Sequence, residues 1–201
     1  MEITSSPALL DHFMPRPDVR ERFNITVRAP APIVLDTACQ FDVQRLWAAR
    51  LIFRMREILM RSRVSASRLP QGILAETLGL GWGLLHRDDH LIIVGARCQP
   101  WRGDVVFTAI APDEFSDYST PEQVKIVWTL ETDALGPASA RFSHETRVVA
   151  TDAEARGRFL RYWRWARFGI VAIRYLMLPA VRRQAEARWR GSHEPTRVRS
   201  A

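Results

Sequence analysis

Along the chain, the spacing of apolar positions switches between a period of two and a period of three to four residues. From Val19 to Val27 polar and apolar residues roughly alternate, which indicates a half-buried β-strand. The period of two returns after Gly79 and predicts five more strands, within residues 79–86, 90–98, 105–111, 124–131 and 140–150. The short turns between most of these strands favour an antiparallel sheet.

Helical spacing occurs before and between these strands. Pro7 to Phe13 predicts a short helix that prolines stop. Ile33 to Phe41 predicts another, since proline is favoured in a first helical turn and the segment follows Ala-Pro-Ala-Pro. A further helix is expected over residues 43–61, where apolar residues fall on two sides. One or two more helical turns are expected within residues 69–78.

The strongest helical signal lies near the C-terminal end. Thr151, Asp152 and Glu154 resemble an N-terminal cap followed by an early acid. Apolar residues then recur over six consecutive steps of three or four, at Phe159, Tyr162/Trp163, Ala166, Gly169/Ile170, Ile173, Leu176/Met177 and Ala180. Arginines, Arg174 among them, are expected on the opposite side. Pro179 has no amide hydrogen, so the helix is expected to kink or end there.

This amphipathic helix needs an apolar surface to pack against. Burying five large side chains of its stripe contributes on the order of 8–15 kcal/mol as an upper bound, comparable to the whole net stability of a domain. Small residues at Ala166 and Gly169 allow close approach in one place, while bulkier ones hold the helix off elsewhere and leave a void. The predicted fold class is α+β: a curved antiparallel sheet of about six strands wrapped around a long C-terminal helix, with two short helices after the first strand.

Charge and composition narrow the classes of function. The net charge of +7 divides into −3 for residues 1–155 (17 basic, 20 acidic) and +10 for residues 156–201 (12 arginines, 2 glutamates), so no nucleic-acid partner is expected. No secretory signal is expected at Met1-Glu2-Ile3-Thr4, and the longest apolar tract, 14 residues, is short for a bilayer. We therefore expect a cytoplasmic domain over residues 1–190 and a disordered basic tail over 191–201. Cys39 and Cys98 are expected to be reduced core residues.

Two segments carry a resemblance to a known family. They are Ile25-Thr26-Val27-Arg28-Ala29-Pro30-Ala31-Pro32, before the first of the two short helices, and His144-Glu145-Thr146-Arg147-Val148-Val149-Ala150-Thr151-Asp152, before the last helix. With the order of elements over residues 19–185, the chain resembles the helix-grip fold of the SRPBCC superfamily (START-like, polyketide-cyclase-like proteins). The resemblance implies a hydrophobic cavity between sheet and terminal helix for lipids, polyketides or other apolar molecules. It implies no particular catalytic residue, and members include carriers, sensors and cyclases.

Large and polar side chains predicted to face the interior are the candidate pocket residues. They are Trp82, Phe107, Trp128, Phe142, His144, Tyr162, Trp163, Ala166, Ile170 and Ile173. His144 shares its strand face with Phe142, so it is expected either to orient a ligand or to be a hydrogen-bonded structural histidine.

The other face of the same strand carries charge. Arg141, Glu145 and Arg147 are expected to form an exposed cross-strand pattern; a one-residue slip of register would instead turn them into the cavity. The glycines of Gly79-x-Gly81-x-Gly83 are expected to permit close packing rather than to bind a nucleotide, because a strand and not a helix follows them.

Three functions remain open at this point. The first is a carrier or sensor that binds an apolar small molecule. The second is an enzyme of cyclase or dehydratase type, and the third is an accessory domain whose cavity is filled by side chains. No metal or cofactor is expected. The arginine-rich helix face is expected to be solvated, with peripheral contact to a membrane as its functional alternative. The oligomeric state stays open.

Overall fold

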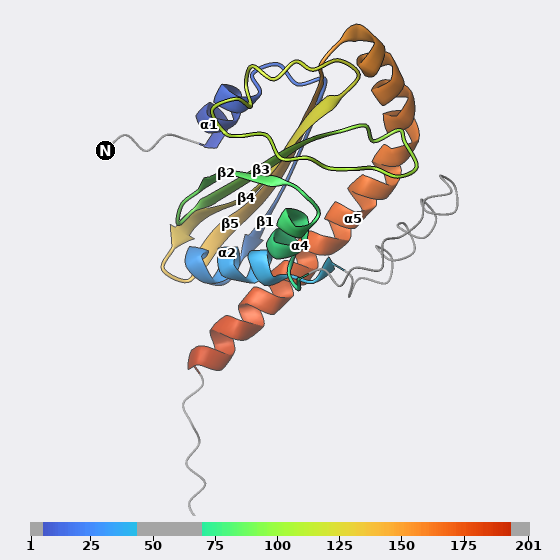
Figure 1. The fold of residues 1–201 in the computed structure, drawn as a ribbon. Coiled ribbons are helices and arrows are strands. Elements are labelled where there is room, and N and C mark those ends of the chain that lie inside the picture. The colour runs from blue at the N-terminus through green and yellow to red at the C-terminus, as the bar shows by residue number, and fades with distance from the viewer. Residues whose placement is uncertain (1–5, 44–69, 194–201) are drawn as a thin grey trace, which may run out of the picture.

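The sheet of the protein contains five antiparallel strands in the order β1-β5-β4-β3-β2. The computed structural model describes residues 6–43 and 70–193. Within these residues the strands are β1 (Val19–Val27), β2 (Gly83–Arg87), β3 (Leu91–Cys98), β4 (Val124–Gly136) and β5 (Ser139–Ala150). The helices are α1 (Ser6–Phe13), α2 (Ala31–Gln40), α4 (Ile73–Gly79) and α5 (Ala153–His193). A curved antiparallel sheet and a long C-terminal helix give the α+β, helix-grip class that the sequence predicts (Figure 1).

One predicted strand is wrong. Residues 105–111 meet β3 at a single bridge, between Thr108 and Arg97, and form no strand. The edge of β3 that faces this segment is already occupied, because β2 pairs with β3 from Gly95 back to Ile92. Only the last residues of β3 extend past its pairing with β2. The alternating sequence of 105–111 therefore has no strand to pair with along most of its length.

The glycine-rich stretch before β2 is also corrected. Gly79 ends α4 instead of beginning a strand, and Gly81 has φ +97°, a left-handed conformation that favours glycine. A Cβ at Gly81 would lie 2.5 Å from the carbonyl oxygen of Phe107. Gly81 and Gly83, whose added Cβ would lie 3.1 Å from the Cβ of Ala109, therefore serve close packing as expected from the sequence.

Helices cover both faces of the sheet (Figure 1). On the inner face, α2, α4 and α5 pack on alternate residues such as Val94, Leu130 and Phe142. On the outer face, α1 and the segment around Phe115 pack on the residues in between, such as Ile93. Because both faces are covered, β3 is apolar at nearly every position instead of alternating.

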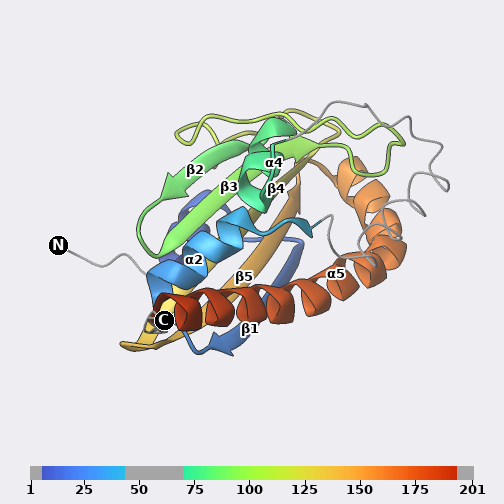
Figure 2. The ribbon, with the colours of Figure 1, turned by 90° about the horizontal axis from the view of Figure 1, so that it is seen from below.

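The C-terminal helix does not end at Pro179 but continues to His193, into the segment predicted as a tail. Around the proline, α5 packs beside α2 (Figure 2), and Leu178 and Val181, on either side of Pro179, are buried there. Burial of these two side chains contributes about 3–6 kcal/mol, enough to offset the roughly 3 kcal/mol that an interior proline costs. An ion pair between Arg188 and Asp36, 2.8 Å apart, joins the same two helices.

Two further predictions concern a helix over residues 43–61 and the state of the two cysteines. The helix predicted over residues 43–61 lies outside the described residues except for Val43, which is buried. Cys98 is buried and Cys39 is half-buried, and neither forms a disulfide within the described residues. Among the residues that the structure describes, no helix is long and apolar enough to cross a membrane.

Candidate functional site

A cavity of about 490 Å³ lies between the inner face of the sheet, α4 and α5. Its wall is largely apolar, and its polar side chains include Glu76, Thr77, Thr146 and Arg174. The curvature of the sheet and of α5 (Figure 2) keeps the middle of the helix away from the strands. The volume falls within the range that binding sites for small molecules occupy, about 300–1,000 Å³.

The structure brings six of the ten predicted pocket residues together on the cavity wall. These are Trp82, Phe107, Trp128, Tyr162, Ile170 and Ile173. Trp82 lies 5.0 Å from Phe107 and 6.4 Å from Trp128 between ring centroids, so one side of the cavity is a continuous row of aromatic rings. Ile170 and Ile173 close the opposite side from α5.

The other four predicted residues do not line the cavity. Phe142 is fully buried in the inner core, and Trp163 packs 5.9 Å from Phe159 near the start of α5. Ala166 is half-buried on α5 outside the cavity wall. His144 lies one layer behind the wall, with its ring 5.7 Å from that of Trp128.

His144 has a defined tautomer. Its Nδ1 lies 2.6 Å from the carbonyl oxygen of Thr129, which only accepts hydrogen bonds, so Nδ1 carries the proton and Nε2 is an acceptor. Nε2 faces the hydroxyl of Thr146 at 3.4 Å, and Thr146 lines the cavity. Burial, with the nearby charge of Arg174, holds the pKa of His144 well below 6.5. The imidazole is therefore neutral at pH 7.

Arg174 is the main correction to the predicted site. The sequence placed it on the solvated side of α5, but it lines the cavity and is half-buried. Burial lowers the pKa of its guanidinium to about 10, partly opposed by the charge of Glu21 on β1. The guanidinium is thus charged at neutral pH. Its position could have been found from spacing alone, because Arg174 is four residues after Ile170 and three before Met177, on the apolar stripe.

Several other wall residues were not predicted. Phe159 and Val148 lie on the inward faces of their elements, so the periodicity already indicated their direction. Leu80, Glu76 and Val105 come from segments outside the sheet, whose course no local pattern predicts. The register of β5 is the one expected, with Phe142 and His144 inward and Glu145 and Arg147 on the other face.

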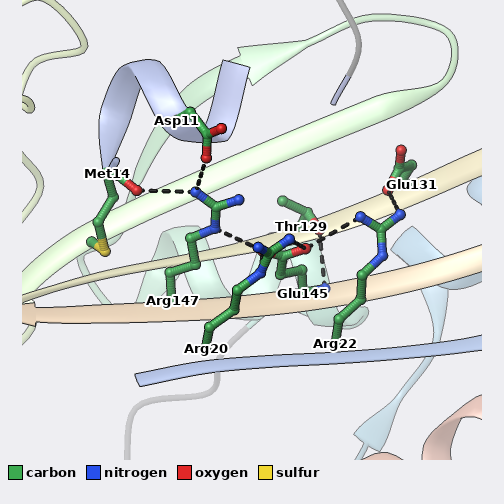
Figure 3. A network of polar contacts seen from close by, with 8 residues as sticks. All are labelled: Asp11, Met14, Arg20, Arg22, Thr129, Glu131, Glu145 and Arg147. Carbon is green, nitrogen blue, oxygen red and sulfur yellow. Dashed lines mark hydrogen bonds and ion pairs between the residues drawn. The ribbon is translucent and has the colours of Figure 1, made fainter. Parts of the chain in front are cut away.

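The prediction that the other face of β5 is exposed is wrong for two of its three charged residues. Glu145 and Arg147 are both 1% exposed and lie under α1 (Figure 3). The Glu145 carboxylate accepts from Arg147, 2.7 Å away, and from Arg20 and Arg22 of β1. Arg147 also donates to the backbone carbonyl of Met14, at 3.0 Å. Only Arg141 of the three residues expected outside is exposed. This network holds α1 on the sheet and is separate from the cavity.

The fold and site together define a helix-grip protein with a largely apolar cavity, whose described wall includes the half-buried cation Arg174. No protein-family model and no curated protein matches the chain. Among solved structures, the chain is similar to the Zhui aromatase/cyclase from Streptomyces sp. R1128, with 12% identity, a TM-score of 0.30, and coverage of 87% of this chain and 98% of that chain. A likeness this distant concerns the fold at most and carries nothing about the contents of the cavity.

Proposed function

We propose that the chain binds an apolar small molecule in the cavity between sheet and α5, as a carrier or sensor. The observation that carries this proposal is the cavity of about 490 Å³ bounded by the aromatic row of Phe107, Trp82 and Trp128. In an accessory domain with a filled cavity, side chains would occupy this space, which the described residues leave open. The proposal includes membership of the SRPBCC superfamily, because the hydrophobic cavity that this superfamily implies lies in the same place.

Simple energetics define what such a ligand has to be. Each buried methylene contributes about 0.8 kcal/mol, so ten of them contribute about 8 kcal/mol. Association itself costs about 4–15 kcal/mol in lost freedom of motion. A ligand that binds by apolar contact alone therefore needs to fill much of the cavity, which favours a lipid-like or polyketide-like molecule over a small fragment.

The test is binding of a neutral, environment-sensitive dye such as Nile red, together with native mass spectrometry for a co-purified ligand. Ile170→Trp is expected to fill part of the cavity and to lower dye affinity at least about tenfold through steric overlap. The matched control is Leu176→Trp on the same helix, at a position that is 41% exposed and off the cavity wall. Absence of dye binding to the unaltered protein, with no co-purified ligand, would contradict the proposal.

A cyclase or dehydratase is the second candidate, and one observation favours it. The neutral His144 presents its Nε2 acceptor toward the cavity-lining hydroxyl of Thr146. A base in this position can take a proton from a bound substrate through the threonine hydroxyl. The test incubates the protein with a polyketide-like compound, either co-purified or supplied, and compares the compound before and after incubation. An enzyme alters the mass or absorbance of the compound. His144→Asn is expected to abolish this change.

An exposed aromatic stripe on α5 favours the carrier over the sensor. Trp165, Phe168 and Tyr175 are 77%, 66% and 67% exposed, although large apolar side chains are normally covered. The exposed Arg164 and Arg167 lie beside them. Aromatic rings next to arginines on one helix suit contact with an anionic membrane surface, from which an apolar ligand is loaded.

A further inference from the structure

Arg174 is a charged group on an otherwise largely apolar wall. It lines the cavity from α5, where the charge of Glu21 on β1 raises its pKa and its own charge lowers the pKa of His144 on β5. Within the part of the chain that the structure describes, no carboxylate lies within ion-pair distance of its guanidinium and no hydrogen bond reaches it. Glu76 also lines the cavity and has an interaction of its own.

A charge in such a position costs free energy unless a ligand supplies a partner of opposite charge. A cation removed from water loses hydration energy that only a hydrogen-bonded partner of opposite charge restores. His144 does not supply that partner, because its imidazole is neutral and its Nε2 faces Thr146. Glu21 attracts the guanidinium from beyond contact distance. The guanidinium of Arg174 is therefore placed to bind an anionic group of a ligand inside the cavity.

We propose that the ligand is an amphipathic carboxylic acid whose carboxylate pairs with Arg174 while its apolar body lies along the aromatic row. This inference rests on the proposed binding function and names its ligand class. The planar guanidinium donates two parallel hydrogen bonds, which matches the two oxygens of one carboxylate. A phosphate monoester carries up to two charges, and a single arginine among apolar side chains would leave part of that charge without a partner.

The experiment compares three ligands with the same twelve-carbon chain: dodecanoate, dodecan-1-ol and methyl dodecanoate, each displacing Nile red at pH 7.5. In the unaltered protein, dodecanoate is expected to bind at least about tenfold more tightly than either neutral ligand, since a hydrogen bond to a charged group contributes about 1.5–3 kcal/mol. This comparison needs no variant. Arg174→Gln is expected to remove the preference, so that dodecanoate and dodecan-1-ol bind this variant with equal affinity.

The matched control is Arg164→Gln, which removes an exposed arginine of the same helix and is expected to keep the full preference. Equal affinity for acid and alcohol in the unaltered protein overturns the inference while the proposed binding function stands. A preference that survives Arg174→Gln overturns the assignment to this residue. If none of the ligands and no dye binds, the proposed function itself fails.

Discussion

The guanidinium of Arg147 lies 2.7 Å from the carboxylate of Glu145, and each side chain is only 1% exposed. Both residues belong to β5, two positions apart, on the face turned away from the cavity. Arg20 and Arg22 of the neighbouring strand approach the same carboxylate. Glu145 thus pairs with three arginines, while Asp11 of α1 also pairs with Arg147 and Glu131 with Arg22. The contacts of Arg147 fix the N-terminal helix to the outer face of the sheet (Figure 3).

The first prediction concerns the stability of this network. Glu145→Gln removes the buried one of the two carboxylates that pair with Arg147, the other being the exposed Asp11. The change is expected to lower the free energy of unfolding by about 3–5 kcal/mol, as for one partner removed from a buried ion pair. Replacing both residues, Glu145→Leu with Arg147→Met, is expected to cost less than the sum of the single changes. Urea unfolding followed by tryptophan fluorescence measures each value.

An exposed ion pair provides the control for this prediction. Asp36 and Arg188 are 2.8 Å apart with side chains 48% and 42% exposed, so Asp36→Asn is expected to cost less than about 1 kcal/mol. A loss for Glu145→Gln no larger than that for Asp36→Asn would show that the buried contacts contribute little.

The second prediction is a pH dependence of stability caused by His144. Its pKa in the fold lies well below 6.5, mainly because of burial, so the unfolded chain takes up the proton first as pH falls. Stability is therefore complete above about pH 6.5 and declines below it, at up to about 1.4 kcal/mol per pH unit. Thermal melts between pH 7.5 and pH 5 measure the decline.

The matched variants separate this histidine from other titrating groups. His144→Asn keeps a side-chain amide donor toward Thr129 and is expected to flatten the decline. His90→Asn, at an exposed turn position, serves as the control. The shifted carboxyls Asp88 and Asp152, whose pKa values are lowered from 3.8, act only at more acidic pH. An equal slope in His144→Asn and the unaltered protein would exclude His144 as the cause.

The sequence predicted well those features that depend on local periodicity. Alternation along β5 correctly indicated that Phe142 and His144 face inward, because a period of two assigns each residue to a face. It did not indicate that Glu145 and Arg147 are buried too. Their burial depends on α1, which is more than a hundred residues away in the chain, and no local pattern shows where that helix packs.

The candidate site was partly predictable for the same reason. Ile170 and Ile173 follow from the helical stripe, and Trp128 follows from strand alternation. The prediction for Arg174 is wrong, because its spacing places it on the apolar face of α5 and its charge does not decide the face. The wall residue Leu80 comes from the irregular chain between α4 and β2, which only the three-dimensional packing defines.

The third prediction concerns the backbone beside the cavity. Gly81→Ala places a Cβ 2.5 Å from the Phe107 carbonyl oxygen at a φ of +97°, so it is expected to cost about 1–3 kcal/mol or more. Because Trp82 and Phe107 form the aromatic wall, dye affinity is expected to fall as well. Gly157→Ala, inside α5 with nothing within 4 Å of the new Cβ, is the control and is expected to stabilise by roughly 0.5–1 kcal/mol. A neutral effect of Gly81→Ala would contradict the close packing.

The fourth prediction tests membrane contact through the aromatic stripe of α5. The protein is expected to co-sediment with vesicles enriched in phosphatidylserine more than with phosphatidylcholine vesicles, and salt is expected to weaken the binding because it screens the arginines. The double change Trp165→Ser and Phe168→Ser is expected to lower partitioning at least about tenfold, since a buried aromatic side chain contributes about 1.5–3 kcal/mol. Leu135→Ser, which removes an exposed apolar side chain on the β4–β5 hairpin, is the control. Binding that is independent of lipid charge and of both rings would show that α5 does not meet the membrane, and loading of the cavity would then proceed from solution.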